Sequence, residues 1–397
     1  MQYIPEDRLN DILSEVARKI NLKRWRYTCQ NSMDAIENYF GVLVPATIHS
    51  SKNMNTSEDD IKLHLLIKIT PNNIEGRLKQ VFSYLFEAEV FFYTALRPMF
   101  SELSAVSIDG LIPNCYHTEL EPDKQVIVLQ DMTFEGYRRY TAHRFLDFEH
   151  LVVALKTLAK FHAVSVIVVE KGNVSDSNNV IAPYTDEYPV ELNTALKLAL
   201  KNHCRYFSGT KYETYLQGLI SRYSSACLDS FKKARRLICG HGDYWKENIL
   251  FKYKENKPDR ACIVDFQTVR FLSPSQDFLS FILVSTDKTT RSTHYDELMS
   301  TYIAAVTDIL IVSNDNLAKS FIDDFKQDLK VVAENCLITS FMGFALWYGL
   351  EEDTLLQSKN TTDKNILKFT ETIGNAIDDL ERLGYITIDN KEQSVFD

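Results

Sequence analysis

The sequence is poor in glycine and proline, which make up 13 and 10 of its 397 residues. Collagen-like proteins and flexible linkers need far more of both, so these classes are excluded. Basic side chains are also in deficit, because 44 lysines and arginines face 54 aspartates and glutamates and leave a net charge of −10. Proteins that bind nucleic acid are usually basic overall or carry a basic stripe. We therefore expect no nucleic-acid partner.

Cysteine pairs with the spacing of a metal or redox site are missing. Seven cysteines are scattered along the chain, and none belongs to a C-x-x-C motif. Because zinc ribbons and redox dithiols both use such pairs, the sequence predicts neither kind of site. We expect these cysteines to be reduced thiols, as is usual in the cytosol.

Signals for secretion and for membrane insertion are missing as well. The first residues, MQYIPEDRLNDIL, contain neither the basic region nor the apolar region of a signal peptide. The longest nearly apolar stretch, residues 337–350, is shorter than the roughly 20 residues that cross a membrane as a helix. We therefore expect a cytoplasmic protein without a membrane partner, and a buried helix over residues 337–350.

What is present has the composition of a globular protein, with 45% hydrophobic and 25% charged residues. The length favours two domains, or two lobes of one enzyme. Before residue 131, the spacing of apolar residues predicts a mixture of helices and strands. The expected helices span residues 6–21 and 78–96, and the expected β segments span residues 36–48, 61–69 and 125–129.

After residue 131 the pattern is mostly helical, apart from one β-hairpin expected within residues 238–266. The expected helices span residues 151–169, 192–204 and 212–234, and helices resume from residue 295 onward. The sequence thus predicts an α+β fold with two lobes. A small β-containing N-terminal lobe would comprise residues 1–130, and a larger helical C-terminal lobe would comprise residues 131–397.

The chemically informative stretch is HGDYWKENILF, residues 241–251, followed by VDFQ at residues 264–267. It contains two carboxylates, Asp243 and Asp265, and the carboxamide of Asn248. Oxygen ligands of this kind suit a hard cation such as Mg²⁺. The expected hairpin would bring Asn248 and Asp265 to the same end of its two strands, and Asp243 lies on the loop just before it. All three side chains would then face one space.

Such a set suits phosphoryl transfer to a hydroxyl group. In that chemistry a loop aspartate orients and deprotonates the incoming hydroxyl, while an asparagine and a second aspartate hold metal ions on the phosphates. The simpler interpretation is that these are turn residues of a strand–turn–strand segment. It explains single positions, but it does not explain the whole spaced set.

With these two runs the sequence resembles the insect ecdysteroid kinase-like family, in the choline kinase and aminoglycoside phosphotransferase branch of the protein-kinase-like fold. Trp245 after His-Gly-Asp and Gln267 after Asp-Phe distinguish this family from its bacterial relatives. Weaker matches lie along most of the chain, in a lysine strand, a helix ending E-x-x-x-Y, and the segments L-x-D, L-A-K-F-H-A and S-P-x-x-D. The resemblance implies a bilobal protein-kinase-like fold.

The resemblance also implies roles for the residues of the central motif. Asp243 would be the catalytic base, and Asn248 and Asp265 would be the metal ligands. His241 would join the catalytic set by orienting the loop rather than by exchanging protons. Two further residues would be structural: His162 as a core histidine with its hydrogen bonds satisfied, and Asp277 as a brace under the metal loop.

A nucleotide site is implied in the first lobe. Lys68, in the strand LLIKI, matches the lysine that holds the α- and β-phosphates, and Glu89 best matches the helix carboxylate that fixes this lysine, with Glu87 as the second choice. Gln130 and Met132 belong to the segment that matches the family's hinge, whose backbone would bind adenine. Trp245 would either pack in the core or form a wall of the acceptor site.

The segment that should close over the phosphates departs from the family pattern. Backbone N–H groups must approach phosphate closely there, which favours glycine. Within residues 33–41 only Gly41 is a glycine, and Ala35 and Ile36 stand where another is expected. Asn38 or the backbone around it would then have to contact the phosphates. Slow turnover or weak ATP binding is a consequence to test.

The resemblance implies a Mg²⁺- and ATP-dependent kinase that phosphorylates a hydroxyl of a lipophilic small molecule. The expected acceptor is an ecdysteroid, or a plant or xenobiotic alcohol in a detoxifying role, bound near helices within residues 190–235 or 341–348. Two alternatives stay open. Glu351, Glu352 and Asp353, next to Trp347 and Tyr348, would suit a choline-like or aminoglycoside-like acceptor. The poor glycine loop would suit an inactive ligand-binding pseudokinase.

Overall fold

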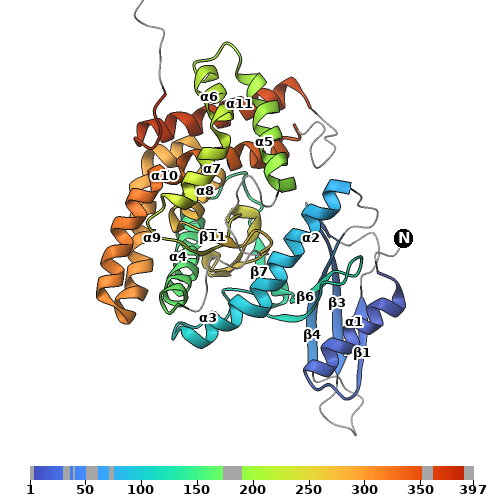
Figure 1. Ribbon diagram of the computed structural model, residues 1–397. Helices are drawn as coiled ribbons and strands as arrows, with labels where there is room; N and C mark the ends of the chain where they lie inside the picture. Colours follow the sequence, from blue (N-terminus) through green and yellow to red (C-terminus); the bar gives the residue numbers. More distant parts are fainter. Residues whose placement is uncertain are drawn as a thin grey trace, which may run out of the picture.

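The structure is a computed structural model that describes residues 4–29, 36–38, 41–50, 61–70, 76–172, 190–350 and 361–388. In Figure 1 the N-terminal strands, drawn in blue, lie at one side of the molecule, and the orange and red helices near the C-terminus lie at the other. All seven cysteines are free thiols.

The N-terminal part is an antiparallel sheet covered on one face by the helix α1 (Glu6–Lys19). The strand order is β1-β3-β4-β6-β5, and β2 pairs with β3. The expected strand over residues 61–69 is confirmed as a central strand, and the other expected β segments are also strands. The strands are β1 (Trp25–Cys29), β2 (Ile36–Asn38), β3 (Gly41–Ser50), β4 (Ile61–Ile69), β5 (Cys115–Glu119) and β6 (Val126–Gln130).

Alternation along β4 and β6 determines which side chains face the rest of the molecule. Successive side chains of a strand point to opposite faces of the sheet. Ile67 and Val128 are buried with α1, whereas Ile127 is buried in the large core that the helices form. Lys68 follows Ile67 and is paired in register with Ile127. The sheet therefore directs Lys68 away from α1 and toward the helical part.

The helix expected over residues 78–96 is more elaborate than its sequence pattern indicated. An α-helix, α2 (Gly76–Phe91), continues into a π-helical turn, η1 (Phe92–Leu96), and then into α3 (Arg97–Leu103). Pro98 stands at the start of α3 and has no N–H to donate to the preceding turn. The chain therefore remains helical here with altered hydrogen bonding, and Glu89 lies just before the change.

The C-terminal part is built around a buried helix, α4 (Phe148–Glu170), which packs against α9 and the small sheets. The helices around it are α5 (Val190–Cys204), α6 (Glu213–Ser221), α7 (Tyr223–Lys232), α8 (Pro274–Ser285), α9 (Lys288–Ser313), α10 (Asp315–Tyr348) and α11 (Asp363–Arg382). Short 3₁₀ turns also occur, η2 (Met132–Glu135), η4 (Arg205–Phe207) and η5 (Lys246–Asn248).

Two expectations for this part are wrong in detail. Residues 212–234 form two helices, because Arg222 leaves the helical conformation (φ −104°, ψ 19°) and binds Glu334 on α10 at 2.6 Å. Helices also resume at Pro274, well before residue 295. Ser273 caps α8 by accepting a hydrogen bond from Ser275 N–H, and Pro274 occupies the first turn, where proline is favoured.

Two helices have the length and apolar composition of membrane spans, α4 and α10. In both, most of the apolar window is buried inside the protein, 72% in α4 and 61% in α10. Burial of this extent is the property of a core helix. The buried helix expected over residues 337–350 is the end of α10, which stops at Gly349 in the left-handed conformation (φ 65°) that glycine favours.

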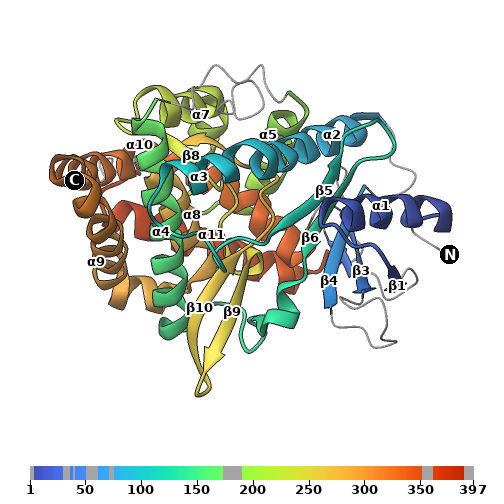
Figure 2. The ribbon, with the colours of Figure 1, turned by 90° about the horizontal axis from the view of Figure 1, so that it is seen from below.

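Between α7 and α8 the chain forms the expected hairpin and two short strands. β9 (Ile249–Lys254) and β10 (Lys257–Ile263) are joined by Glu255 and Asn256, both with positive φ as in a tight two-residue turn. β7 (Tyr137–Arg139) adds to β9, and β8 (Ile238–Gly240) pairs with β11 (Arg270–Leu272). Figure 2 shows this hairpin beside α4. The predicted α+β fold, with a small sheet and a larger helical part, is confirmed.

Candidate active site

The loop that follows β8 depends on a glycine for its conformation. Gly242 has a φ of +81°, and a Cβ atom there would collide with Arg270 and with the carbonyl oxygen of Thr268. Below the loop, the buried carboxylate of Asp277 accepts hydrogen bonds from the N–H groups of His241 at 2.6 Å and Gly242 at 2.8 Å. Asp277 therefore braces the loop from α8, as expected.

His162 and His241 both help to hold this loop through hydrogen bonds. His162, on α4, lies 3.1 Å from Asp277 through Nε2 and 2.6 Å from the Tyr302 hydroxyl through Nδ1, so it is the satisfied core histidine that was expected. His241 Nε2 lies 3.0 Å from the carbonyl oxygen of Val264, and the Asp243 N–H donates to its Nδ1. Burial lowers the pKa of His241. The geometry thus places His241 between the two chain segments that carry Asp243 and Asp265.

Asp243 and Asn248 are in direct contact. Asn248 donates through Nδ2 to the backbone oxygen of Asp243 at 2.9 Å and to its Oδ2 at 3.0 Å. Burial and the negative charge of Asp265 raise the pKa of Asp243 to about 6, against the lowering effect of the Asn248 hydrogen bond. A carboxylate with its pKa close to neutrality can accept a proton at physiological pH and release it again.

Lys68 joins the N-terminal sheet to this loop region. Its Nζ lies 2.5 Å from Glu89 and 2.6 Å from Asp265 Oδ1, and the lysine is buried. Gly41, on the neighbouring strand β3, makes room for it, because a Cβ atom there would lie 3.3 Å from Lys68 Cε. Asp265 has a φ of +68°, an uncommon conformation for a residue with a side chain.

The structure decides between the two candidate helix carboxylates. Glu89 points to Lys68, whereas Glu87 is partly exposed and accepts a hydrogen bond from Ser83 at 3.3 Å. Both glutamates lie in the last turns of α2, and they differ in the direction in which their side chains leave the helix axis. Glu89 and Lys68 therefore form the expected pair, and the position of Asp265 beside them is an additional contact.

Phe266 holds Asp265 in place and was not identified from the sequence. Its ring stacks on Phe92 of the π-helical turn at 3.6 Å and 6° between planes, and it also contacts Phe161 and His241. This aromatic cluster connects the helix of Glu89, the central helix α4 and the catalytic loop. The VDFQ motif was a signal for Asp265, but the partners of its phenylalanine come from distant segments.

The segment expected to bind adenine is well fixed. Gln130 donates its N–H to Asn114 O at 2.8 Å, and Asp131 donates to His64 O at 3.0 Å. The Asp131 carboxylate then caps η2 through Thr133 N–H at 2.9 Å. Met132 is buried. Adenine binding by the backbone at Gln130 and Met132 stays a prediction.

Several predicted positions lie wholly or partly outside the described residues. Asn38 ends β2 and pairs in register with Gly41, but its side chain is not among those described. Ala35 and the acidic run from Glu351 to Asp353 also lie outside them. The expectations for a phosphate-closing segment and for a carboxylate-rich acceptor site therefore stay predictions.

The residues at this site fit a magnesium ion. Lys68 is one positive charge beside the carboxylates of Glu89 and Asp265, and the carboxylate of Asp243 adds a further negative charge close by. In the described part of the chain no group of three or more His, Cys, Asp or Glu side chains forms a metal cage. Mg²⁺ needs none, because it is commonly held by one or two protein ligands together with phosphate oxygens. Asp265 and the side-chain oxygen of Asn248 can supply these ligands.

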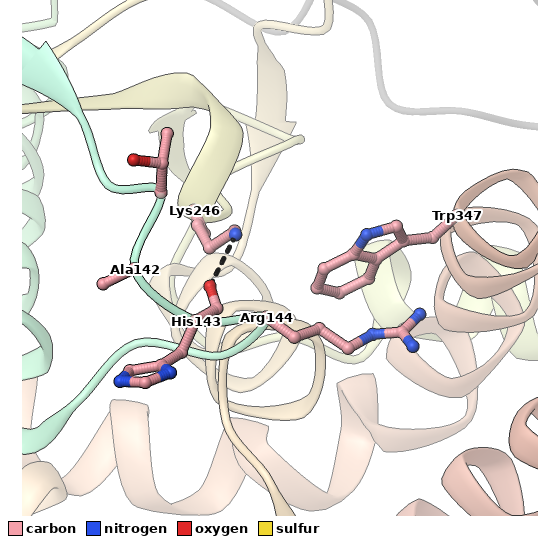
Figure 3. A pocket seen from close by; sticks show the side chains of 6 residues that line it. Ala142, His143, Arg144, Lys246 and Trp347 are labelled. Carbon is pink, nitrogen blue, oxygen red and sulfur yellow. Dashed lines mark hydrogen bonds between the residues drawn. The ribbon is translucent and has the colours of Figure 1, made fainter.

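A cavity of about 420 Å³ opens beside the catalytic loop (Figure 3). The indole of Trp245 packs edge-to-face on Trp347 at 5.9 Å, and its buried Nε1 lies close enough to Asp243 to lower the pKa of that carboxyl, without the geometry of a full hydrogen bond. Trp245 therefore packs on an aromatic residue that lines the cavity. The cavity is lined by Thr141, Ala142, His143, Arg144, Lys246 and Trp347.

This lining agrees only in part with the sequence expectation. Trp347 belongs to the expected aromatic segment 341–348, whereas no lining residue of this cavity comes from residues 190–235. Arg144 was not identified, because nothing in its neighbourhood of the sequence marks it. The fold brings it against the end of α10, about 200 positions away in the chain.

Comparison with known proteins places the chain among kinases of small molecules. The model of the ecdysteroid kinase-like family matches residues 35–314. An ethanolamine kinase from Plasmodium vivax is 9% identical over 96% of this chain and 91% of that protein, with a TM-score of 0.44. A choline kinase from Streptococcus pneumoniae is 10% identical over 93% and 99%, with a TM-score of 0.43. Aminoglycoside 2′-phosphotransferase-IIIa, solved with GDP, is 11% identical over 94% and 99%, with a TM-score of 0.44.

A comparison with curated proteins finds no significant match. The family match includes the lysine strand, the helix of Glu89, the catalytic loop and the segment of Asp265. The bilobal protein-kinase-like fold expected from the resemblance is confirmed. Because this match extends over well more than half of its length, the chain belongs to the ecdysteroid kinase-like family.

Proposed function

We propose that this protein transfers the γ-phosphoryl group of ATP to a hydroxyl of a lipophilic small molecule. Family membership makes it a small-molecule kinase, and the use of ATP and the kind of acceptor are the proposed parts. The observation that carries the proposal is the convergence of two groups from separate parts of the chain. Lys68 lies 2.5 Å from Glu89 and 2.6 Å from Asp265, and Asn248 binds Asp243 in the adjoining loop.

In this proposal Asp243 is the catalytic base. The acceptor oxygen forms a bond to the γ-phosphorus, the bond from that phosphorus to the bridging oxygen breaks, and ADP leaves. The proton of the acceptor hydroxyl passes to an oxygen of Asp243, whose pKa of about 6 suits it to accept a proton at neutral pH. Asn248 orients this carboxylate through its Nδ2. His241 holds the loop rather than exchanging protons.

Lys68 would bind the α- and β-phosphates, with its ammonium group held by Glu89. A magnesium ion on Asn248 and Asp265 would neutralise phosphate charge. The backbone at Gln130 and Met132 would bind adenine, and Asn38 would contact the phosphates. ATP would then lie between residues 1–130 and residues 131–397, which we propose as the two lobes.

The acceptor we propose is an ecdysteroid, or a plant or xenobiotic alcohol. Family membership supports this class. Phosphorylation would add a dianionic group to a lipophilic alcohol and make it soluble in water. Such a step suits hormone inactivation or detoxification in the cytoplasm, where we propose that the protein acts.

The test is label transfer from γ-labelled ATP to a panel of ecdysteroids, plant phenolics, choline and aminoglycosides, with products separated and identified by mass. We expect label on an ecdysteroid or a phenolic alcohol, and only when Mg²⁺ is present. Label on choline or an aminoglycoside would be consistent with the fold and with the proposed residue roles, but it would contradict the proposed class of acceptor. Binding of an acceptor without any binding of Mg²⁺-ATP would indicate an inactive ligand-binding protein.

A further inference from the structure

The cavity beside the catalytic loop joins three elements that the sequence keeps far apart. Thr141 to Arg144 lie on the segment between β7 and α4, Lys246 begins η5 within the catalytic motif, and Trp347 lies in the last turn of α10. Trp245 packs edge-to-face on the lining residue Trp347 at 5.9 Å, and it stands two positions after Asp243 in the same loop. A molecule in this cavity is therefore beside the loop that carries the proposed base, because Lys246 belongs to that loop.

Two cations line the cavity, and they differ in how they are paired. Lys246 is buried, donates to His143 O at 3.1 Å and pairs with Glu247 at 3.2 Å, so its charge is largely compensated (Figure 3). Arg144 has no carboxylate within ion-pair distance among the residues that the structure describes, and its buried Nε has no hydrogen-bond partner there. Among the described residues, the lining of the cavity thus includes one cation without a carboxylate partner.

Arg144 also covers the aromatic surface of the cavity. Its guanidinium carbon lies 4.4 Å from the ring centre of Trp347 and 3.7 Å from that of Tyr348. Aromatic faces of this kind are what a cationic acceptor would bind. Here the chain's own cation occupies them, and a second cation would meet like charge. Choline-like and aminoglycoside-like acceptors are disfavoured for this reason.

We propose that the cavity binds an anionic group of the acceptor, a carboxylate, sulfate or phosphate ester, while the acceptor's hydroxyl reaches Asp243. This inference rests on the proposed function and narrows its substrate class: of the alcohols proposed above, a plant or xenobiotic alcohol that already carries a negative charge is accepted ahead of neutral ones, ecdysteroids included. The planar guanidinium of Arg144 offers paired N–H donors, which bind such oxygens more strongly than a neutral donor does. Trp347 provides an apolar wall for the adjoining part of the acceptor.

Three probes with one aromatic ring and one hydroxymethyl group isolate the effect of charge. They are 4-(hydroxymethyl)benzoate, its methyl ester, and 4-(aminomethyl)benzyl alcohol. Binding to the full chain is followed by tryptophan fluorescence, since Trp347 lines the cavity and Trp245 packs on it, and is repeated by titration calorimetry. We expect the acid to bind about tenfold or more tightly than the ester, the increment of a charge-assisted hydrogen bond, and the amine to bind most weakly.

Arg144→Gln should remove the preference for the acid, and Arg144→Lys, which keeps the charge, should retain the order of the three probes. Arg138→Gln is the matched control, because Arg138 stacks on Tyr253 at 4.2 Å outside the cavity. This control should preserve the preference. If Arg144→Gln fails to fold, the order of the probes on the wild type and on Arg144→Lys still decides the matter.

The outcome separates this inference from the proposed function. Equal binding of acid and ester, tighter binding of the amine, no binding of the acid, or an unchanged preference in folded Arg144→Gln would each overturn the inference. With Mg²⁺-ATP added, phosphorylation of the ester or the amine ahead of the acid would overturn it while the kinase stands. Binding of the acid that depends on Arg144, without nucleotide binding, would preserve the charge preference and reject the kinase.

Discussion

Lys68 is held between two carboxylates, and its environment determines what its loss would do. Burial by itself lowers the pKa of a lysine, but the charges of Asp265 and Glu89 outweigh burial and raise the pKa of Lys68. The lysine therefore remains charged throughout the physiological range. Both carboxylates are largely withdrawn from solvent, and this ammonium group is the one cation within ion-pair distance of them among the described residues.

Replacing Lys68 by methionine keeps a long side chain and removes the charge. Two buried carboxylates then lose their partner, and we expect the free energy of unfolding to fall by about 3 to 5 kcal/mol. Urea unfolding measures the change. Lys79→Met is the matched control, since the pair of Lys79 with Asp123 is exposed and should be worth less than about 1 kcal/mol. Equal effects of the two substitutions would contradict a buried ion pair at Lys68.

Asp277 provides a pH-dependent test of the brace under the catalytic loop. Burial would raise its pKa, but the His162 hydrogen bond, the charges of His162 and His241 and the Gly242 N–H outweigh burial and lower the pKa below its ordinary 3.8. A carboxyl with a lowered folded-state pKa stabilises the protein fully above its unfolded pKa. That contribution is lost as the pH falls through the folded-state pKa.

Asp277→Asn should therefore lower the free energy of unfolding by about 1.5 to 3 kcal/mol near neutral pH, the value of hydrogen bonds to a charged group. The difference between wild type and variant should shrink below pH 3.8 and stay constant above about pH 5. Chemical unfolding at a series of pH values measures it. A difference that grows as the pH falls would show that Asp277 is not ionised in the folded protein.

How far residues could be assigned from sequence depended on whether their neighbours were local. Asp243, Asn248 and Asp265 share one motif and one hairpin, so their meeting was predictable. Glu89 and Glu87 could not be separated, because helix rotation relative to β4 is a tertiary property. Arg144 was missed for the same reason, since only packing places it on Trp347.

At the scale of elements, the catalytic loop depends on a glycine. Gly242 combines a positive φ with close neighbours. Gly209 has a similar φ of +73°, but a Cβ atom there would meet no neighbouring group within 4 Å in the described part of the chain. Alanine substitutions at the two glycines therefore distinguish the cost of backbone strain, which both share, from the cost of a steric collision, which only Gly242 has. The loop's conformation, in turn, fixes the direction of Asp243.

Gly242→Ala should cost more stability than Gly209→Ala. We expect about 1 to 2 kcal/mol for the left-handed backbone in Gly209→Ala, and at least about 1 kcal/mol more in Gly242→Ala, where Arg270 and Thr268 must move. Thermal unfolding of both variants measures the difference. The Gly242 variant should also lose phosphoryl transfer while the Gly209 variant retains it. Equal loss in both would mean that the crowding around Gly242 is relieved without cost.

Elements with a strong local signal were predicted closely, and tertiary contacts account for the differences. The strand predicted over residues 61–69 coincides with β4. Apolar spacing continues across Arg222, so the break between α6 and α7 was not visible; it accompanies the bond of Arg222 to Glu334. The start of α8 had a local signal in Ser273 and Pro274 that was not used.

At the scale of the whole molecule, the site exists only where the two parts of the chain meet. Lys68 and Glu89 come from the N-terminal sheet and its helix, and Asp243 and Asp265 come from the hairpin region after residue 238. Phe266 stacks on the π-helical turn that follows Glu89, so the helix of Glu89 and the segment of Asp265 share one core. Although the chain carries a net charge of −10, the charged side chains that line the cavity beside the catalytic loop, Arg144 and Lys246, are both cationic.

The measurement that tests the central claim most directly is the rate of phosphoryl transfer from ATP to an accepted alcohol in wild type and Asp243→Asn. Asp259→Asn, on the exposed hairpin, is the matched control. We predict that Asp243→Asn lowers kcat by about 10²- to 10⁴-fold, the usual contribution of a general base, while Mg²⁺-ATP binding and the control variant stay close to wild type. Transfer by Asp243→Asn at the wild-type rate would contradict the assignment of Asp243 as the base and with it the proposed mechanism.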